Sequence, residues 1–256
     1  MTRPIAEQRK RSVAVPSTDA STDTGSEPVP RTDDGAEDTL DLQLPEDLLS
    51  LLRTGDPWPV DPSPPGGELL DGPGAWKPVS TPVGVFQLVP VDIERDLSLL
   101  SHWMNDPAVA AFWELSGPES VTRAHLRPQL DGDGRSVPCL GVLQGTPMSY
   151  WEIYRADLDP LARHYPARPH DTGLHLLIGG VADRGRGTGT TLLRTVSDLV
   201  LDNRPQCPRV VAEPDLRNTP SVSAFLGAGF RYAAEVDLPD KRAALMIRDR
   251  AFRDLM

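Results

Sequence analysis

A short segment rich in glycine and arginine has the composition of an anion-binding loop. It consists of Arg184, Gly185, Arg186, Gly187, Thr188 and Gly189. Glycines let backbone N–H groups approach an anion closely, and the N-terminus of a following helix adds a partial positive charge. The segment therefore predicts a site for a pyrophosphate group with the two arginines as fixed cations, although a surface loop of the same composition is the plainer alternative.

Two titratable residues stand in otherwise apolar, strand-like runs and are candidates for proton transfer. His175 lies within the run 174–178, and Glu213 ends the run 210–212 just before Pro214. Histidine and carboxylate side chains are common general acids and bases. The alternatives are a core histidine with satisfied hydrogen bonds and an acidic residue that supports the following turn.

Alternating strand and helix patterns surround these candidates from residue 83 onward. Hydrophobic periodicity and turn signals predict strands at 85–91, 137–143, 148–154, 173–179, 209–213, 231–238 and 243–248. Helices are predicted at 93–104, 109–113, 119–130 with an interruption at Pro128, around 192–200, and at 219–227. The order predicts a mixed α/β (α+β) domain in which the glycine–arginine loop joins a strand to a helix.

The loop and its surroundings resemble the acyl-CoA-dependent acetyltransferase superfamily known as GNAT. Arg184, Gly187 and Gly189 match the R/Q-x-x-G-x-G/A motif of that superfamily. The resemblance covers about residues 84–250 and implies a mixed, mostly antiparallel sheet with splayed central strands flanked by helices. It also implies that the coenzyme is held by Leu177, Ile178, Arg184, Gly185, Arg186, Gly187, Thr188, Gly189 and Asn218.

Five further strings resemble the siderophore-biosynthesis branch of this superfamily. They lie at 102–105 with Pro107, 112–114, 150–154, 171–175 and 213–218. Enzymes of that branch acylate the hydroxylated side-chain nitrogen of lysine, cadaverine or ornithine, or the corresponding lysine amine, in aerobactin-, mycobactin- and desferrioxamine-type pathways. The resemblance implies an acyl-CoA N-acyltransferase that transfers an acetyl or succinyl group to an N-hydroxylated amine and forms a hydroxamate.

The same resemblance implies roles for individual side chains. His175 would contact the acceptor, and Glu213 would act as the base where some relatives carry an aspartate. The acceptor pocket would be lined by Trp103, Asn105, Trp113, Glu114, Tyr150, Trp151, Glu152 and Asp171. Core packing is the alternative for the tryptophans. We expect no metal ion, and we expect His125, His164 and His170 at the surface.

The first 82 residues form an acidic extension that has no counterpart in the resemblance. They carry 15 acidic and seven basic side chains, so they hold most of the net charge of −11. Their composition predicts disorder to about residue 40, a short helix at 45–53, and a linker or surface wrap rich in Pro and Gly at 56–82. We therefore expect the transferase domain at 83–256, and we expect deletion of 1–40 to leave turnover intact.

Composition argues against several other classes of protein. The net charge of −11 and the lack of a long basic run disfavour nucleic acid or an anionic membrane as the main partner. Because no apolar run reaches membrane-spanning length, we expect a cytoplasmic enzyme whose partners are acyl-CoA, a small hydroxylated amine and other siderophore-pathway enzymes. Two alternatives stay open, namely a GNAT enzyme for another amine such as an aminoglycoside, and a non-catalytic CoA-binding module.

Overall fold

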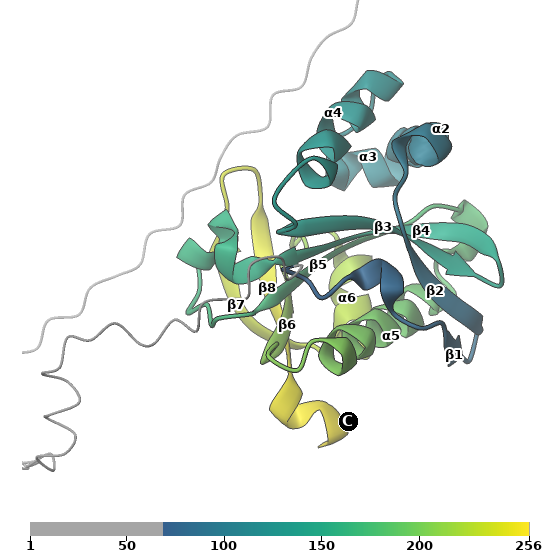
Figure 1. Cartoon of the computed structure of the whole chain (residues 1–256). Coiled ribbons are helices and arrows are strands. Elements are labelled where there is room, and N and C mark those ends of the chain that lie inside the picture. Colours follow the sequence, from purple (N-terminus) through teal and green to yellow (C-terminus); the bar gives the residue numbers. More distant parts are fainter. Residues whose placement is uncertain (1–68, 256) are drawn as a thin grey trace, which may run out of the picture. The chain divides into compact units, whose positions relative to one another are not determined.

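A single mixed sheet between two groups of helices makes up the part of the chain that the computed structural model describes, residues 69–255 (Figure 1). Eight strands of these residues follow the order β1-β2-β3-β4-β5-β6-β8-β7 across the sheet. Neighbouring strands are antiparallel except β5 and β6, which are parallel. The strands are β1 Val79–Thr81, β2 Gly84–Pro90, β3 Ser136–Leu143, β4 Thr146–Arg155, β5 Thr172–Ile178, β6 Arg209–Ala212, β7 Arg231–Asp237 and β8 Arg242–Asp249.

Helices cover both faces of the sheet. Helices α2, α3 and α4 lie on one face, and α5 and α6 lie on the other (Figure 1). Their bounds are α2 Ile93–Met104, α3 Pro107–Trp113, α4 Glu119–Leu130, α5 Thr188–Asn203 and α6 Thr219–Gly227. Short 3-10 helices lie at η1 Pro73–Ala75, η2 Ala156–Leu158, η3 Pro160–Arg163, η4 Val181–Asp183 and η5 Arg250–Leu255. No helix of residues 69–255 is long and apolar enough to cross a membrane.

Capping side chains explain where three of the helices begin. Asp92 accepts hydrogen bonds from backbone N–H groups at the start of α2, and Asp106 does the same for α3. The carboxamide of Asn218 caps α6 by accepting from the N–H of Ser221. Such caps satisfy donors that have no partner within the helix, which fixes the first residue of each helix.

Strand β4 divides the core because its side chains alternate between the two faces of the sheet. Trp151 packs with Phe86 and with residues of α5. Tyr150 instead joins the cluster under α2 and α4, together with Leu100 and Leu126. Neighbouring residues of one strand therefore enter opposite layers of the molecule.

The predicted mixed α/β class and mostly antiparallel sheet are confirmed, but two details are wrong. Pro128 does not interrupt α4, which continues to Leu130. Proline in the last turn of a helix removes only its own N–H bond there, so the turn survives. The folded body also begins before residue 83, because Leu70 and Trp76 are core residues and β1 pairs with β2. The helix predicted at 45–53 and the predicted disorder lie outside the described residues.

Candidate active site

The central strands separate where the candidate catalytic residues lie. Strands β5 and β6 pair only at Thr172 with Val210 and at Gly173 with Val211, after which they diverge. His175 stands on the diverging part of β5, and Glu213 directly follows β6. A parallel pair this short leaves a wedge-shaped opening in the sheet, and both side chains lie at it.

Three titratable side chains meet at this opening. The Nε2 of His175 lies 2.5 Å from Oε1 of Glu213, and its Nδ1 lies 2.8 Å from Oε2 of Glu152. Glu152 is the register partner of His175 across the β4–β5 pair, so the sheet itself sets this contact. The imidazole ring is therefore held between two carboxylates that come from opposite sides.

Glu213 has two more partners besides His175. The Tyr154 hydroxyl donates to its Oε2 at 2.7 Å, and the Lys241 Nζ lies 3.6 Å from its Oε1. Tyr154 reaches this position because it lies directly over Gly173, where an added Cβ would fall 2.0 Å from the tyrosine ring. Gly173 is thus required at the point where the strands begin to separate.

The charged groups in this cluster shift one another's pKa values. Burial alone lowers the pKa of His175, but the carboxylates of Glu213 and Glu152 outweigh it and raise the pKa to about 10. Burial alone raises the pKa of Glu213, whereas His175, Lys241 and Tyr154 lower it to about 2. The resting cluster therefore contains an imidazolium between two carboxylates.

A cavity of about 260 Å³ opens beside this cluster. Its apolar lining includes Phe112, Trp113, Leu174, Leu176 and Phe225, and its polar lining includes His125, Glu152, His175, Glu213, Asn218 and Lys241. About a third of the His175 side chain is exposed, whereas Glu213 is buried. The cavity can hold a small side chain with its reacting atom near His175.

Aromatic rings shape one wall of the cavity. Trp113 makes edge contacts with His125, Tyr150 and His175, with ring centroids 5.6 to 6.4 Å apart. The ring of Tyr154 lies 4.8 Å from that of His175. A cation near such ring faces is stabilised, and this wall also keeps water from one side of the imidazole.

The glycine–arginine loop precedes α5 as predicted. Gly187 is the N-cap residue of α5 with φ 77°, and Gly185 has φ 73°, a backbone region that favours glycine. An added Cβ at either position, or at Gly189, would meet no atom within 4 Å. The start of α5 is therefore open to an approaching anion and fits a pyrophosphate.

The two arginines of this loop, both predicted to hold the coenzyme, differ in their surroundings. Arg184 donates to the backbone oxygens of Ile178 and Gly179 and to Asp106 at 2.9 Å, so it fastens the loop to the end of β5. Arg186 is exposed. The Arg186 side chain is therefore more accessible to solvent than that of Arg184.

Other residues predicted to hold the coenzyme have mixed placements. Leu177 is buried in the cluster that includes residues of α2, α3 and α4. Ile178 is half-buried, and its carbonyl accepts from Arg184. Thr188 begins α5, and Asn218 both caps α6 and lines the cavity.

Four residues predicted in the acceptor pocket lie elsewhere, and this corrects their assignment. Trp151 is fully buried on the opposite face of the sheet, and Trp103 is buried against Gly179. Asp171 is fully buried and binds Arg209 through both carboxylate oxygens. Asn105 hydrogen-bonds backbone groups of Ser101 and Gly117, so it holds a loop.

The remaining pocket residues divide as follows. Trp113 and Glu152 line the cavity, and Tyr150 lies behind Glu152, to which its hydroxyl donates at 2.9 Å. Glu114 is exposed at the C-terminus of α3 and is not part of the cavity lining. The cavity is therefore lined by only some of the residues that were predicted to form the acceptor pocket.

Sequence reasoning missed several members of the site. His125 was expected at the surface, yet its Nε2 lies 2.5 Å from Oε1 of Glu152. Its spacing from the buried residues Thr122 and Leu126 could have placed it on the inner side of α4. Tyr154 could have been found from the alternation that starts at Glu152, whereas Lys241 carries no such signal.

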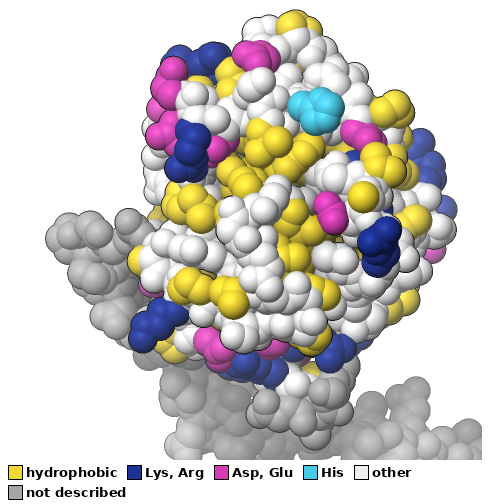
Figure 2. Space-filling model, turned by 90° about the vertical axis from the view of Figure 1, so that its right-hand side faces the viewer, with side chains coloured by type: hydrophobic (Ala, Val, Ile, Leu, Met, Phe, Trp, Pro, Cys, Tyr) yellow, Lys and Arg dark blue, Asp and Glu magenta, His cyan; other side chains and the backbone are white. Residues whose placement is uncertain are grey.

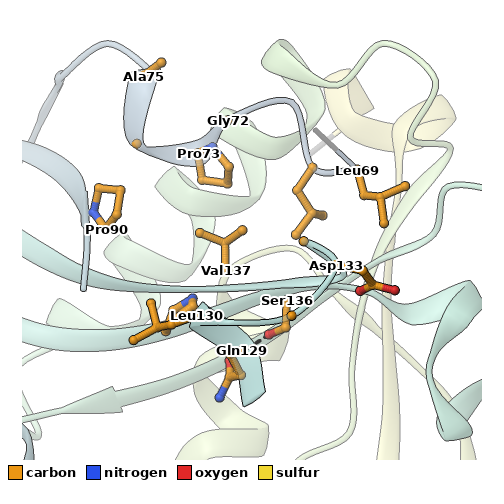
Figure 3. Close-up of a pocket in the computed structure, with 15 residues that line it drawn as sticks. Leu69, Gly72, Pro73, Ala75, Pro90, Gln129, Leu130, Asp133, Ser136 and Val137 are labelled. Atoms are coloured by element: carbon orange, nitrogen blue, oxygen red, sulfur yellow. Dashed lines mark hydrogen bonds between the residues drawn. The ribbon is translucent and has the colours of Figure 1, made fainter. Parts of the chain in front are cut away.

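Figure 2 shows one face on which hydrophobic side chains gather in the middle with charged side chains around them. Another cavity, of about 520 Å³, lies between the segment 69–75 and the end of α4 (Figure 3). Its lining contains Asp133 but no histidine or cysteine, so it offers no comparable acid–base group.

The site and the fold together define a class of protein. Residues 92–238, more than half of the chain, match the acetyltransferase (GNAT) domain. The protein belongs to the GNAT acetyltransferase family, and it is an acyl-CoA-dependent acyltransferase.

Two curated relatives narrow the comparison. The chain is 39% identical to the lysine N-acyltransferase MbtK of Mycobacterium tuberculosis, over 59% of this chain and 71% of that protein. It is also 39% identical to the N(6)-hydroxylysine O-acetyltransferase of Escherichia coli, over 62% of this chain and 50% of that protein. Both relatives are named for acyl transfer to a lysine-type acceptor.

Solved structures share the fold. An uncharacterized protein from Bacillus halodurans superimposes with a TM-score of 0.66 at 32% identity, over 70% of this chain and 92% of that chain. The aminoglycoside acetyltransferase AAC(6')-Ib, solved with coenzyme A and kanamycin, superimposes with a TM-score of 0.57 at 24% identity, over 66% of this chain and 98% of that chain. The second likeness concerns the fold alone.

Proposed function

We propose that this enzyme transfers an acetyl or succinyl group from acyl-CoA to the N-hydroxylated side-chain amine of lysine, ornithine or cadaverine. The product is a hydroxamate for siderophore assembly, and the reaction takes place in the cytoplasm beside other enzymes of the siderophore pathway. The relatives named for lysine and hydroxylysine acyl transfer support this proposal. The observation that carries it is the placement of the Glu213 carboxylate, which lines the cavity and is held there by His175 and Tyr154.

That carboxylate favours an acceptor that arrives neutral. An alkylammonium with a pKa of about 10.4 holds its proton far more tightly than Glu213 does, so Glu213 is a poor base toward it. An N-hydroxylated amine is much less basic and reaches the site already neutral. Its nitrogen becomes acidic only after attack on the thioester, when it carries a positive charge that Glu213 can relieve.

The cluster supplies both an acid and a base for a balanced transfer. The acceptor nitrogen forms a bond to the thioester carbon, the carbon–sulfur bond breaks, and the N–H proton passes to Glu213. The departing CoA thiolate takes the proton of the His175 imidazolium. Glu213 then returns its proton to Nε2 of His175 across their 2.5 Å contact, which restores the resting state.

Roles for the other groups follow from their positions. The N-terminus of α5 and Arg186 would hold the pyrophosphate of the coenzyme, while Arg184 keeps the loop in place. Lys241 is the lysine that lines the cavity, and it is suitably placed to pair with a carboxylate of the acyl group or of the acceptor. Turnover of acetyl-CoA and of succinyl-CoA with the same acceptor would therefore show which acyl donor the enzyme prefers.

A hydroxamate assay with purified protein tests the proposal. Wild-type protein would acylate N-hydroxylysine, N-hydroxyornithine or N-hydroxycadaverine with acetyl- or succinyl-CoA, in preference to the parent amines and to kanamycin. The Glu213→Gln and His175→Ala variants would each lose about 100-fold or more in kcat. Glu235→Gln, which changes an exposed glutamate of β7, is the matched control.

Three outcomes would contradict the proposal. Wild-type turnover in both variants would remove Glu213 and His175 from catalysis. Kanamycin or parent amines as the better acceptors would point to a different amine substrate. Binding of CoA without turnover of any acceptor would indicate a non-catalytic module.

A further inference from the structure

The carboxylate of Glu152, which lines the cavity, is held by four side chains. Its Oε1 accepts from the Tyr150 hydroxyl at 2.9 Å and from Nε2 of Gln129 at 2.8 Å, and it lies 2.5 Å from Nε2 of His125. Its Oε2 is the atom that contacts His175. One oxygen is thus anchored by three groups, while the other is reserved for the histidine.

The anchoring groups are themselves held in place. The Ser136 hydroxyl donates to Oε1 of Gln129 at 2.7 Å (Figure 3). This bond turns the amide N–H₂ of Gln129 toward Glu152. Tyr150 is fully buried on the same strand as Glu152. With these donors in place, the carboxylate is stable as an anion and its position hardly varies.

The imidazole of His175 depends on this anion. Both ring nitrogens face carboxylates, and a carboxylate only accepts, so each nitrogen is satisfied when it carries a proton. With Glu213 alone, one nitrogen would have no partner and the ring could adopt either tautomer. Glu152 removes that freedom from the opposite side of the ring.

We propose that Glu152 is a positioning residue of the transfer reaction. Its fixed carboxylate orients His175 and keeps the imidazole ring doubly protonated, with the Nε2–H directed at Glu213. Glu152 therefore acts through His175, which must be charged to protonate the departing thiolate. This inference rests on the proposed function for its kinetic consequences, although the state of His175 can be measured without any substrate.

Several charged or titratable groups surround His175 and can affect its titration. They are Glu152 and Tyr154 on β4, His125 on α4, Asp159 before η3, Glu213 after β6, and Asp240 and Lys241 before β8. Among these, Glu152 and Glu213 make direct hydrogen-bonding contacts with the ring. Removing the charge of Glu152 while leaving the others intact isolates its contribution.

The first experiment is a titration of the His175 ring by NMR in ligand-free protein, with the signal assigned from a His175→Gln variant. In the wild type, both ring nitrogens would carry protons at pH 8. In Glu152→Gln the pKa of His175 would fall by about one to three units, because one of its two anionic partners is lost. Glu152→Asp keeps the charge and would restore part of the shift, and Glu235→Gln would change nothing.

The second experiment measures hydroxamate formation across pH. Glu152→Gln would lower kcat by up to about tenfold at pH 8, with KM for acyl-CoA within about twofold, because a fall of the His175 pKa from about 10 to about 7 leaves about a tenth of the rings protonated at that pH. At pH 6 most of the kcat would return, because the ring is protonated again. A merely structural glutamate would give a loss that does not depend on pH.

These results would overturn the inference. A folded Glu152→Gln protein with unchanged His175 titration and unchanged kcat profile would do so. If that variant does not fold, the wild-type titration decides, because a His175 that titrates near its ordinary value of 6.5 is not held as proposed. If the His175 pKa changes as expected in the variants but the wild type forms no hydroxamate, the result would count against the proposed function alone.

Discussion

The two faces of strand β4 are equally buried, yet they do opposite things. Tyr150, Glu152 and Tyr154 point to one face, and all three take part in the hydrogen-bonded cluster around His175. Trp151 and Ile153 point to the other face and pack in the core next to α5. Burial therefore does not distinguish a functional residue from a structural one in this strand, whereas the face does.

The faces also differ in what stabilises them. The site face buries ionised and hydroxyl groups that are acceptable there only because each has a partner. The core face next to α5 depends mainly on contact area, and there the Trp151 indole N–H donates to the Ser149 hydroxyl at 2.9 Å. Substitutions on the two faces should consequently fail in different ways.

Trp151→Ala should have the largest effect on stability. Removing a fully buried indole leaves a cavity in the core, and the free energy of unfolding should fall by about 3–5 kcal/mol. Urea unfolding followed by circular dichroism measures this change. Activity per folded molecule should stay near that of the wild type, and a selective loss of kcat at unchanged stability would show that the core face also serves the site.

Tyr154→Phe should be less destabilising and should act on the chemistry as well. It removes the hydroxyl donor to Glu213, a hydrogen bond to a charged group worth about 1.5–3 kcal/mol. Because that bond helps to lower the pKa of Glu213, the acidic limb of the kcat profile should move to higher pH. Phenylalanine keeps the ring over Gly173, so an unchanged acidic limb would contradict the contact.

Stability should also depend on pH, and its change from one pH unit to the next should be smaller than the effects of the two substitutions above. The pKa of His175 is raised, so its stabilisation is full below its ordinary value of 6.5 and is lost as pH rises toward about 10. The pKa of Glu213 is lowered, so its stabilisation is full above its ordinary value of 4.5 and is lost as pH falls toward about 2.

Denaturant unfolding at several pH values measures this dependence. Stability should be greatest between about pH 4.5 and 6.5 as far as these two groups decide it. Trp151→Ala should keep the alkaline decline, and Glu152→Gln should flatten it. Equal slopes in both variants would mean that the two faces do not differ in this way.

Local patterns predicted much of the fold. The helices at 93–104, 119–130 and 219–227 have their predicted bounds, since apolar spacing and capping residues define them within a few residues of chain. Strand β1 was missed because it has three residues and lies at the edge of the sheet, beside Pro82. Such a strand depends on its neighbour rather than on its own composition.

The candidate site was only partly predictable, because its key contacts join distant segments. The resemblance pointed to His175 and Glu213, and the structure brings them together. The resemblance also predicted Trp151 in the pocket, because it treated the residues 150–154 as one group. Adjacent residues of a strand, however, point to opposite faces of the sheet. Arg184 binds Asp106, 78 residues earlier, and no local pattern reveals that contact.

The brief pairing of β5 with β6 has a mechanical consequence. Backbone pairing between these strands is limited to two residue pairs, so the sheet consists of two parts, β1–β5 and β6–β8, whose backbones are joined along a short stretch. A ligand that spans the opening would tie the two parts together and shift unfolding by mass action. Coenzyme should then protect backbone amides in both parts from hydrogen exchange, well beyond the atoms it touches.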